Sequence, residues 1–455
     1  MRKTWKRIGL MALAFSMSLL SGCSEKEDET KKTENQVERI ELSVKQKEIA
    51  EQYTKDFIAR DFDKLSKNYE YTSEMKKEIV KESFQDQLSQ SLEAFGKLKE
   101  QQEPYGEEYK GSINLQVPCM FENQNLNIVI SINEQNQIQG FFIKPYQENE
   151  GSVKLPEGVK ESAVNLQIDD SHTLPGTLTT PDKGSGFPVV ILVAGSGPND
   201  RNETINQNKP FQDIAWGLAQ QGIASYRYDK RTFVYPKEFT LKDTVKQEVT
   251  DDVLLAVSVM EKTAAVDASK IYVLGHSLSG YLMPRIAQQT KVPAGYILMA
   301  APARPLEDLF VEQIEFLARE DGKISDEEQK VINKYTEDRE KVKQIDKMND
   351  TEVVFGALSK AYMNDLKDYD PIDAAKTIDK KVMVAQGLRD YQVTEEDYSL
   401  WKNTYDKSEN WSFHTYKNAN HIFVDGTGKA SSADYQKKGN VTKNFINDIV
   451  KYIQK

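Results

Sequence analysis

Short apolar runs alternate with helical patterns through the C-terminal part of the chain, and this alternation constrains the fold more than any other feature of the sequence. Each run is almost continuously apolar, as strands that are buried on both faces of a sheet are. Between the runs, apolar residues recur at helical spacing, for example Val245, Val249 and Val253. Such alternation predicts an α/β fold, with a mostly parallel sheet and crossover helices on both sides. The runs are residues 189–193, 224–228, 271–274, 296–299 and 382–385.

The run at residues 271–274 leads directly into a turn that bears Ser277. Gly275 lies two residues before this serine, Ser279 lies two residues after it, and a helical pattern follows from Gly280. A nucleophilic serine on a strand-to-helix turn needs small residues at both flanking positions, because strand and helix approach closely there. Ser279 matches the pattern in size, although glycine is commoner at that position. The context predicts Ser277 as a nucleophile, and the alternative is an ordinary strand-to-helix turn.

A serine hydroxyl needs a base beside it, and the chain has only 4 histidines. The alternating segments at residues 163–168 and 177–179 predict an antiparallel edge of the sheet, and His172 lies in this edge, before the serine. His276 lies in the turn itself, and His414 lies in a strand-like segment. His421 follows that last strand in a loop, and only one further helical pattern follows it. A serine on this kind of turn is served by a histidine on the last loop, so we predict His421 as the base.

The acid that orients the base is predicted at Asp390. This residue lies just past the buried run at residues 382–385 and between the serine and the histidine in chain order. Asp397 is a rival, but it belongs to the following helical pattern. The predicted catalytic triad is therefore Ser277, Asp390 and His421, and the alternative is that these are residues of surface loops.

Residues from about 303 to 377 interrupt the alternation of strands and helices. This segment is rich in Glu, Lys and Asp, shows no strand pattern, and places Leu309, Phe310 and Phe316 at helical positions. It leaves the predicted sheet after the carboxyl end of a strand, which is where the active sites of such sheets lie. We predict a helical insertion that caps the site.

Residues 44–146 form a separate domain by their pattern. Helical spacing changes to a period of two at Ile113, Leu115 and Val117, which predicts a small α+β domain with an antiparallel sheet. The order of elements resembles the cystatin-like domains related to nuclear transport factor two, in which a helix packs on a curved sheet. We see no acid, base or metal-ligand constellation in it. We interpret it as an accessory or spacer domain, with a ligand-binding pocket as the alternative.

The first residues resemble the export signal of bacterial lipoproteins. Positive charges at residues 2–7 precede an apolar stretch at residues 8–20, which is too short for a typical membrane span. Small residues then lead into Cys23, as in a lipobox. The resemblance implies a signal peptide at residues 1–22, acylation of Cys23, and anchoring at the extracytoplasmic face of the cell membrane. The alternative is a plain secretory signal whose cysteine is incidental.

The polar composition of residues 23–43 predicts a flexible tether between lipid and protein. Beyond Cys23 only Cys119 remains, so no intramolecular disulfide is expected in the mature chain, and Cys119 is interpreted as a small buried apolar residue. The formal net charge of -11 repels phosphate backbones, so nucleic acid is not an expected partner.

Several segments together resemble a bacterial α/β-hydrolase family of serine carboxylesterases. The resemblance covers residues 155–455 and implies an α/β-hydrolase domain that cleaves short or medium acyl esters through an acyl-enzyme, without a metal or organic cofactor. Asp200, Arg201, Arg227 and Asp229 recur in the pattern, either to bind substrate or as ion pairs that fix loops. The segments that carry the resemblance are residues 195–201, 226–231, 275–280, 390–394 and 420–423.

The same resemblance implies an oxyanion hole. One donor is the backbone N–H of Leu278, after the nucleophile, and the other comes from the Gly-rich turn that follows residues 189–193. Many relatives have His-Gly in this turn, and this chain has Ala194 in the histidine position. By that alignment the N–H of Ser196 is the candidate for the second donor, and the N–H of Gly197 is the alternative. The turn lacks the lysine and the spacing of nucleotide-binding loops.

The sequence therefore predicts a serine hydrolase, most simply a carboxylesterase that acts on a small-molecule ester. One alternative is a serine aminopeptidase-like enzyme with the same triad, which an acidic pocket for a substrate amino group would favour. The other is a non-catalytic surface lipoprotein that binds a ligand, against which the correct order of the triad argues. The sequence predicts neither the physiological ester nor the oligomeric state.

Overall fold

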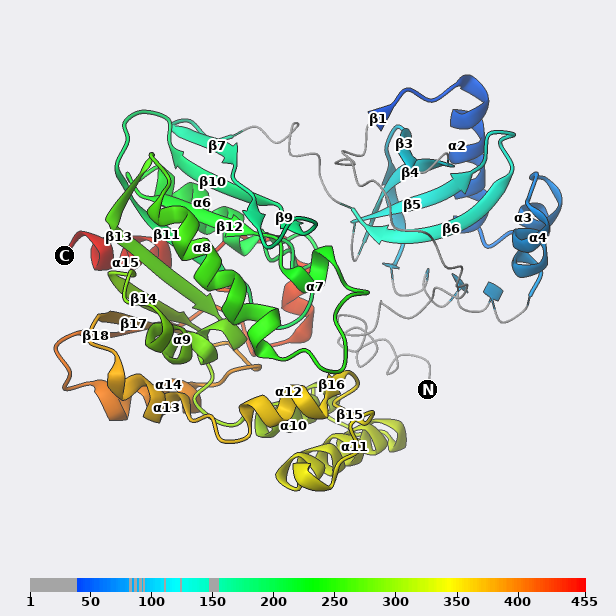
Figure 1. The fold of residues 1–455 in the computed structure, drawn as a ribbon. Helices are drawn as coiled ribbons and strands as arrows, with labels where there is room; N and C mark the ends of the chain where they lie inside the picture. The colour runs from blue at the N-terminus through cyan, green and yellow to red at the C-terminus, as the bar shows by residue number, and fades with distance from the viewer. Residues whose placement is uncertain are drawn as a thin grey trace. The chain divides into compact units, whose positions relative to one another are not determined.

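The chain divides by its contacts into an N-terminal unit within Glu25–Lys154 and a C-terminal unit at Leu155–Lys455, as seen in the computed structural model (Figure 1). Residues 1–22, Cys23 and most of the predicted tether lie outside the part that the structure describes. None of the helices in the described part combines the length and the apolar character needed to span a bilayer. The structure describes residues 39–81, 84–85, 88–89, 92, 95–109, 112–122, 125–146 and 155–455.

In the N-terminal unit, helices precede an antiparallel sheet, as the sequence predicts. Tyr53 and Phe57 of α2 pack with strand residues such as Val117 and Ile128 in one apolar core. Cys119 is buried in the same core, and burial raises the pKa of its thiol to about 12. The elements are α2 (Val44–Ile58), α3 (Phe62–Lys67), α4 (Ser73–Ile79), β1 (Arg39–Ile40), β2 (Leu98–Gln101), β3 (Tyr105–Tyr109), β4 (Ser112–Phe121), β5 (Asn125–Ile132) and β6 (Ile138–Pro145).

The short strand β1 lies in the segment predicted as tether. It pairs antiparallel with β3, with Ile40 opposite Gly106. Ile40 packs over that glycine, since a Cβ added to Gly106 would lie 2.6 Å from Ile40 Cγ1. The tether prediction was therefore too long at its C-terminal end. Two paired residues within a charged segment carry no strand period that a sequence pattern could reveal.

The C-terminal unit is built on an eight-stranded sheet in the order β18-β17-β14-β13-β11-β12-β10-β7. Neighbouring strands from β18 to β12 run parallel, and β10 and β7 form an antiparallel edge. The apolar runs of the sequence are its central strands, which confirms the predicted α/β fold. The strands are β7 (Val159–Ala163), β10 (Gly176–Pro181), β11 (Phe187–Val193), β12 (Ala224–Tyr228), β13 (Val266–His276), β14 (Gly295–Met299), β17 (Lys381–Gly387) and β18 (Trp411–Tyr416); β8 (Leu166–Gln167) and β9 (Thr173–Leu174) form a separate pair.

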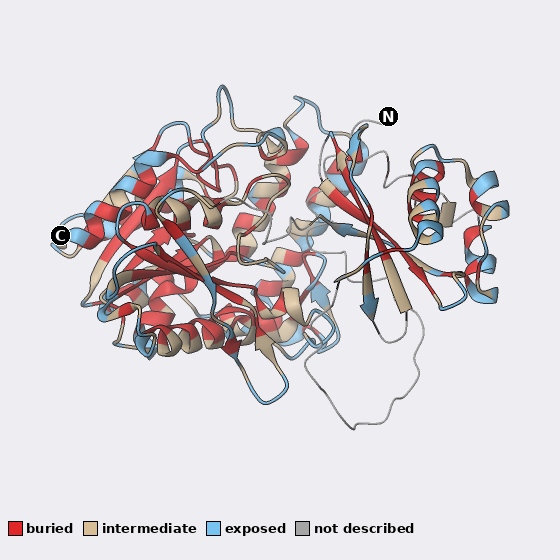
Figure 2. Ribbon diagram, turned by 90° about the horizontal axis from the view of Figure 1, so that it is seen from above, coloured by how far each residue is buried: buried red, intermediate tan, exposed pale blue. Residues whose placement is uncertain are grey.

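Helices cover both faces of this sheet, so its strands are buried on both sides (Figures 1 and 2). Successive side chains of a strand point to opposite faces, and in β11 Ile191 joins one apolar core while Leu192 joins the other. The first core includes α8 (Asp251–Glu261), α9 (Leu278–Gln289) and α14 (Glu395–Tyr405), and the second includes α6 (Pro210–Ala219) and α15 (Lys443–Gln454).

The segment before α15 is held by Asn208, which lies just before α6. The Asn208 amide donates to the carbonyls of Tyr435 (3.0 Å) and Lys437 (3.1 Å), and its oxygen accepts from the Gly439 N–H (2.8 Å). One buried amide thereby joins two segments that lie more than two hundred positions apart in the chain.

The predicted cap is mostly helical. Its helices are α10 (Leu306–Ala318), α11 (Asp326–Lys343), α12 (Lys360–Leu366) and α13 (Pro371–Ala374). It also contains a hairpin of β15 (Val353–Val354) and β16 (Leu358–Ser359), which corrects the expectation of a segment without strands. Each of these strands has two residues, which is too short for a detectable alternation.

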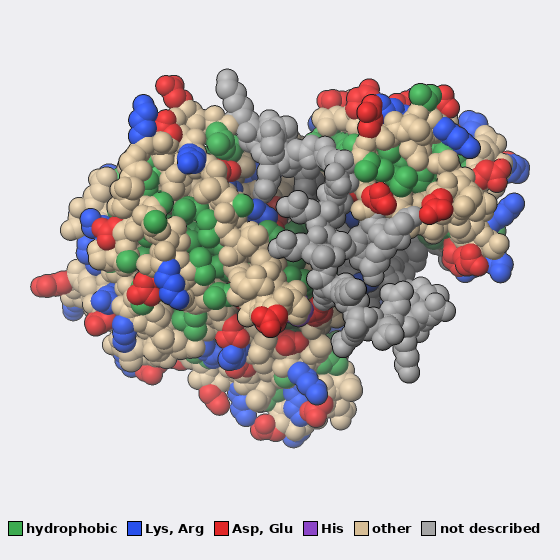
Figure 3. Space-filling view, turned by 45° about the horizontal axis from the view of Figure 1, so that its top comes forward, with side chains coloured by type: hydrophobic (Ala, Val, Ile, Leu, Met, Phe, Trp, Pro, Cys, Tyr) green, Lys and Arg blue, Asp and Glu red, His purple; other side chains and the backbone are tan. Residues whose placement is uncertain are grey.

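On the face that Figure 3 shows, basic and acidic side chains are interspersed over both units. Neither sign of charge gathers into a stripe on that face.

Candidate active site

Ser277 lies between β13 and α9 in a strained backbone conformation. Its φ of 52° and ψ of -118° fall where residues with a side chain rarely occur. The turn is held by the Ser277 N–H, which donates to the Met299 carbonyl of β14 (2.9 Å). A Cβ on Gly275 would lie 2.5 Å from Met283 Cε and from the Ser279 carbonyl oxygen, so the small residue expected there has a steric cause.

The Gly-rich turn at residues 195–197 lies beside this serine. A Cβ added to Gly195 would come within 3.2 Å of Ser277 Cβ. The fully buried Ser279 donates its hydroxyl to the Ala194 carbonyl (2.5 Å). A glycine could not make that bond, so the departure from the commoner residue links the first turn of α9 to the Gly-rich turn.

His421 and Asp390 are buried together and joined by a hydrogen bond. Nδ1 of the histidine is 2.6 Å from Oδ2 of the aspartate. The other carboxylate oxygen, Oδ1, accepts from the backbone N–H groups of Gln392 (2.8 Å) and Val393 (3.0 Å). The carboxylate is thus fixed by the chain that follows β17, and it fixes the imidazole ring in turn.

The rival acid, Asp397, lies in a different network. Its Oδ1 accepts from the Ala303 N–H (2.9 Å) and its Oδ2 pairs with Arg304 (2.9 Å), both at the start of the cap. The structure therefore joins His421 to Asp390 and uses Asp397 to hold the entry to the cap.

His276 connects the serine turn to the loop of His421. Its Nε2 is 3.0 Å from the His421 carbonyl, and the two rings lie 4.5 Å apart between centroids. Its Nδ1 is 2.8 Å from Glu203 Oε1. Burial lowers the pKa of His276, but the charge of Glu203 and its hydrogen bond outweigh burial and raise that pKa above its ordinary value. Among the described residues Ser277 Oγ and His421 Nε2 share no hydrogen bond, and such bonds often tighten only around substrate.

The backbone N–H groups of the Gly-rich turn are not equivalent. The Gly195 N–H donates to Glu203 Oε1 (2.6 Å), and the Gly197 N–H donates to Glu248 Oε1 (2.8 Å). Both glutamates are buried. The Ser196 N–H, between them, has no partner among the described residues.

The carbonyl groups of the same turn are also occupied. All three accept from side chains: Gly195 from Lys230 Nζ (2.6 Å), Ser196 from Asn199 Nδ2 (2.9 Å) and Gly197 from Thr232 Oγ1 (3.1 Å). The Ser196 N–H is thus the one polar backbone group of residues 195–197 that is left without a partner in the described structure. The Leu278 N–H, at the first position of α9, likewise has no intrahelical acceptor. Of the two candidates that the sequence offers in the turn, Gly197 is occupied and Ser196 is available.

The recurring charged residues fix loops. Arg201 and Asp229 form a two-pronged ion pair, with Nε–Oδ1 at 3.0 Å and Nη2–Oδ2 at 2.9 Å. Asp200 accepts from the Thr204 N–H (2.8 Å), and the buried Arg227 bonds Glu161. These contacts match the loop-fixing alternative.

The cap packs against the segments that follow Asp390 and His421. Phe316 of α10 stacks on Tyr391, the residue after Asp390, with ring centroids 4.4 Å apart and an interplanar angle of 5°. Glu320, after α10, accepts from the N–H (2.9 Å) and hydroxyl (2.7 Å) of Ser432. Phe310 instead packs on Phe355 inside the cap, at 4.9 Å between centroids.

The sequence did not predict the buried charges of Glu203, Lys230 and Glu248 around the turn, and it placed His276 there without giving it a role. For Lys230 a signal exists, because it lies in the recurring segment at residues 226–231. For Glu248 there is none, since a glutamate in a helical pattern looks like any exposed one. Within the described residues no cluster of His, Cys, Asp and Glu is arranged to hold a metal ion.

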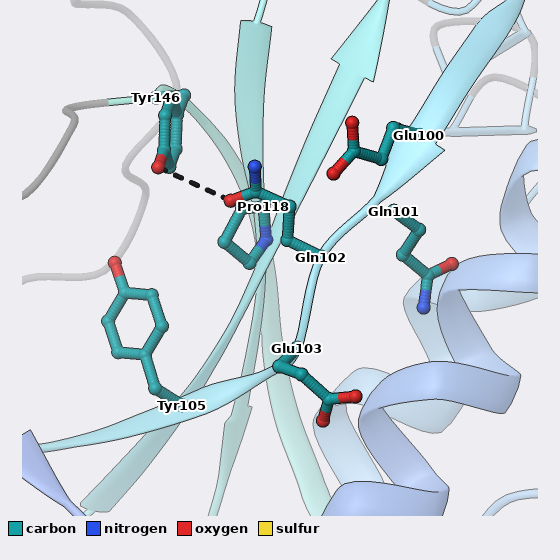
Figure 4. A pocket seen from close by; sticks show the side chains of 7 residues that line it. All are labelled: Glu100, Gln101, Gln102, Glu103, Tyr105, Pro118 and Tyr146. Carbon is teal, nitrogen blue, oxygen red and sulfur yellow. Dashed lines mark hydrogen bonds between the residues drawn. The ribbon is translucent and has the colours of Figure 1, made fainter.

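The N-terminal unit has an open pocket of about 500 Å³ (Figure 4). The rings of Tyr105 and Tyr146 lie on one side and Glu100 and Glu103 on the other. The Tyr146 hydroxyl donates to Gln102 Oε1 (3.4 Å). The pocket keeps the ligand-binding alternative for this unit open. It is lined by Glu100, Gln101, Gln102, Glu103, Tyr105, Pro118 and Tyr146.

Comparison with known proteins gives one match to a family model and one to a protein of named activity. A family model described as a protein of unknown function (DUF3887) matches residues 50–141. The chain is 38% identical over 336 residues to Esterase EstD of Thermotoga maritima, covering 74% of this chain and 78% of that protein.

Solved structures with a similar fold include two proteins of low sequence identity. Est1E from Butyrivibrio proteoclasticus is 15% identical, with 64% of this chain and 97% of that chain covered at a TM-score of 0.41. The α/β hydrolase GrgF from Penicillium sp. sh18 is 16% identical, with 65% and 98% covered at a TM-score of 0.44.

Proposed function

The chain belongs to the α/β-hydrolase esterase family that includes Esterase EstD, and on that premise we propose that it is a serine carboxylesterase whose nucleophile, acid and base are Ser277, Asp390 and His421. The observation that carries the proposal is the buried His421–Asp390 pair, joined at 2.6 Å, on a loop that His276 links to the strained strand-to-helix turn of Ser277. A structural serine has no need of such a backbone, whereas a nucleophile gains an exposed Oγ from it.

The proposal assigns each step of the reaction to a residue. Ser277 Oγ attacks the ester carbonyl, and His421 Nε2 takes its proton and then delivers it to the leaving alcohol. Asp390, bonded to Nδ1, holds the ring in the required tautomer. The same histidine then activates a water that hydrolyses the acyl-serine and releases the acid.

The oxyanion formed on attack is held by two backbone donors. Leu278 and Ser196 supply the N–H groups, and the occupied neighbours on both sides of Ser196 support this choice. Gly197 is excluded as the donor because its N–H already bonds Glu248.

The test is covalent labelling of the full chain with a fluorophosphonate, followed by peptide mapping. The adduct is expected on Ser277 and not on Ser279, whose hydroxyl is committed to the Ala194 carbonyl. Ser277→Ala should abolish labelling and lower turnover of p-nitrophenyl acetate by on the order of a millionfold, with an unchanged melting temperature. Wild-type turnover by this variant would remove Ser277 from the mechanism.

The alternatives make distinct predictions in the same assays. A serine aminopeptidase would cleave an aminoacyl-p-nitroanilide with higher kcat/KM than p-nitrophenyl acetate. A non-catalytic lipoprotein would fail to react with the fluorophosphonate at all. The esterase proposal requires labelling together with a preference for the ester.

We also propose that Cys23 carries a lipid that holds the enzyme at the extracytoplasmic face of the membrane. The support is the sequence at residues 1–23, with its positive start, short apolar stretch and small residues before the cysteine. Metabolic labelling with a fatty-acid analogue should mark the wild-type protein and not Cys23→Ser. Label that persists on Cys23→Ser would exclude this cysteine as the anchor.

A further inference from the structure

Three buried polar side chains form a cluster against the Gly-rich turn at residues 195–197. Lys230 Nζ is 2.7 Å from Glu248 Oε1, and these side chains are only 3% and 6% exposed. The Tyr362 hydroxyl donates to the other carboxylate oxygen, Oε2, at 2.7 Å. The three come from separate segments: Lys230 follows β12, Glu248 lies in a π-helical turn (Lys246–Thr250), and Tyr362 lies in cap helix α12.

The lysine and the glutamate hold the turn on both sides of Ser196. Lys230 Nζ donates to the Gly195 carbonyl at 2.6 Å, and Glu248 Oε1 accepts from the Gly197 N–H at 2.8 Å. The Gly195 carbonyl and the Ser196 N–H belong to one planar peptide group, so the lysine contact fixes that group directly, and the glutamate contact fixes the peptide group that follows it. The direction of that N–H is therefore set by a buried ion pair.

Packing alone does not account for an ion pair at this place. Taking two charges out of water costs free energy that their attraction only partly returns, and apolar side chains of similar size often stabilise a protein equally well. An oxyanion hole, by contrast, requires donors that are already aimed before the charge develops, and a buried charged pair restricts a turn more strictly than apolar contacts do. Glu248 itself lies in a π-helical turn, a feature that often marks functional sites.

Tyr362 extends this cluster into the cap. Burial, followed by the charge of Glu248 and the hydrogen bond to it, holds the pKa of Tyr362 well above its ordinary value, so the hydroxyl stays protonated and donates. The residue lies in the first turn of α12, and its own N–H bonds the Ser359 hydroxyl (3.1 Å). The carboxylate of Glu248 thus contacts both the turn and the cap.

Resting on the proposed esterase function, we propose that Lys230 and Glu248 are positioning residues that aim the Ser196 N–H at the oxyanion, and that Tyr362 makes this alignment depend on the seated cap. The pair touches no reacting atom. It acts through the backbone of residues 195–197.

The first experiment removes both charges together, so that neither is left buried alone. Lys230→Met with Glu248→Gln in the full chain should lower kcat on p-nitrophenyl acetate about ten- to hundredfold, less than the loss of a whole oxyanion donor, with KM within about twofold. A trifluoromethyl ketone, which forms an oxyanion on the serine, should bind more weakly by the same factor as kcat/KM falls. A role in stability alone would leave that inhibition constant unchanged.

The second experiment tests the connection to the cap. Tyr362→Phe removes one hydroxyl and should lower kcat about three- to tenfold, with a matching rise in the inhibition constant of the ketone. Its matched control is Tyr405→Phe, because Tyr405 is also buried and donates to the Ile372 carbonyl (2.5 Å), away from the turn. That control should leave kcat and the inhibition constant at wild-type values.

The outcomes separate this inference from the proposed function. If Ser277→Ala abolishes turnover but the paired variant keeps the wild-type inhibition constant, the positioning role is wrong and the esterase stands. If Ser277→Ala remains active, the esterase mechanism itself fails. Should the paired variant not fold, Tyr362→Phe decides alone: an unchanged inhibition constant overturns the inference and a raised one supports it.

Discussion

The two units bury charge in different ways. In the described part of the N-terminal unit the buried charged side chain is Asp56, which accepts from the Tyr69 hydroxyl (2.7 Å) and the Gln52 amide (3.1 Å) at the edge of an apolar core. The C-terminal unit buries many more, in strands, loops and helices and in the cap: Glu203, Arg227, Asp229, Lys230, Glu248, Asp252, Glu328, Asp338, Arg389, Asp390 and Asp397, together with the imidazoles of His276 and His421.

Burying a charge costs free energy, so a domain that only has to pack avoids it. A domain that has to orient a nucleophile, a base and an oxyanion donor accepts that cost where the chemistry occurs. The two units therefore differ in how many charges they bury, and the unit with many buried charges is the one that carries Ser277, Asp390 and His421.

The largest effect is expected when one buried carboxylate is neutralised in each unit. Asp390→Asn should lower kcat on p-nitrophenyl acetate by on the order of ten-thousandfold, because an asparagine favours the wrong tautomer of His421. Asp56→Asn makes the same chemical change and should leave kcat unchanged. Steady-state kinetics and melting curves of both variants check this. Similar losses of activity in the two would show that buried charge does not distinguish the units.

The cap should show a smaller effect that depends on the position of the side chain. Phe316→Ala removes the ring that stacks on Tyr391. It should change the ratio of kcat/KM for p-nitrophenyl octanoate to kcat/KM for the acetate by a factor that corresponds to about 1 to 3 kcal/mol. Phe310→Ala, inside the cap against Phe355, should lower the melting temperature and leave the ratio unchanged. A changed ratio in both variants would mean that the interior of the cap also shapes the pocket.

The pair of His276 and Glu203 should make the melting temperature of the C-terminal unit change with pH by a few degrees. The pKa of His276 is raised in the folded state, with Glu203 and Asp390 facing the ring and His421 beside it. The pair therefore contributes fully to the free energy of unfolding at pH values below the unfolded-state pKa of about 6.5. This contribution is lost as pH rises through the folded-state pKa of His276.

The measurement is the melting temperature of wild type and Glu203→Gln between pH 5.5 and about 9. Their difference should be largest at the acidic end and should shrink as pH rises. Asp56→Asn, as the control from the other unit, should show no such trend. A difference that is constant across this range would contradict a charged His276 in the fold.

The smallest effect is expected from removing the N-terminal unit. A chain that lacks residues 24–150 should hydrolyse p-nitrophenyl acetate within about tenfold of wild type, a change of roughly 1.4 kcal/mol or less in the barrier. Activity and melting temperature of the shortened protein test this. If it is folded yet inactive, the N-terminal unit completes the active site, and the division between the units drawn here is wrong.

Much of the fold could be predicted because its signals are local. The parallel strands β11, β12, β13, β14 and β17 of the large sheet are buried on both faces along most of their length and are therefore almost continuously apolar there. Asp390, the predicted acid, comes shortly after the end of β17. Strands of two residues, such as β1 and β15, fall below the length at which a period can be detected.

The candidate site was predictable only in part, for a related reason. The small residues around its turn indicate Ser277, and the position after the last strand indicates His421. Lys230 and Glu248 carry no local signal of their meeting, because 18 positions separate them and only the tertiary fold brings them together. The sequence also left Ser196 and Gly197 as alternatives, which the partners of Gly197 distinguish.

The hydrogen bonds from Asn208 to the segment before α15 have a consequence for how the enzyme folds. The loop that bears His421 is held at its far end by contacts of very high sequence separation, and contacts that close long loops form late in folding. During refolding, secondary structure should therefore recover before hydrolysis does. Recovery of esterase activity should therefore report the last folding step, because activity appears only after the end of the chain has docked.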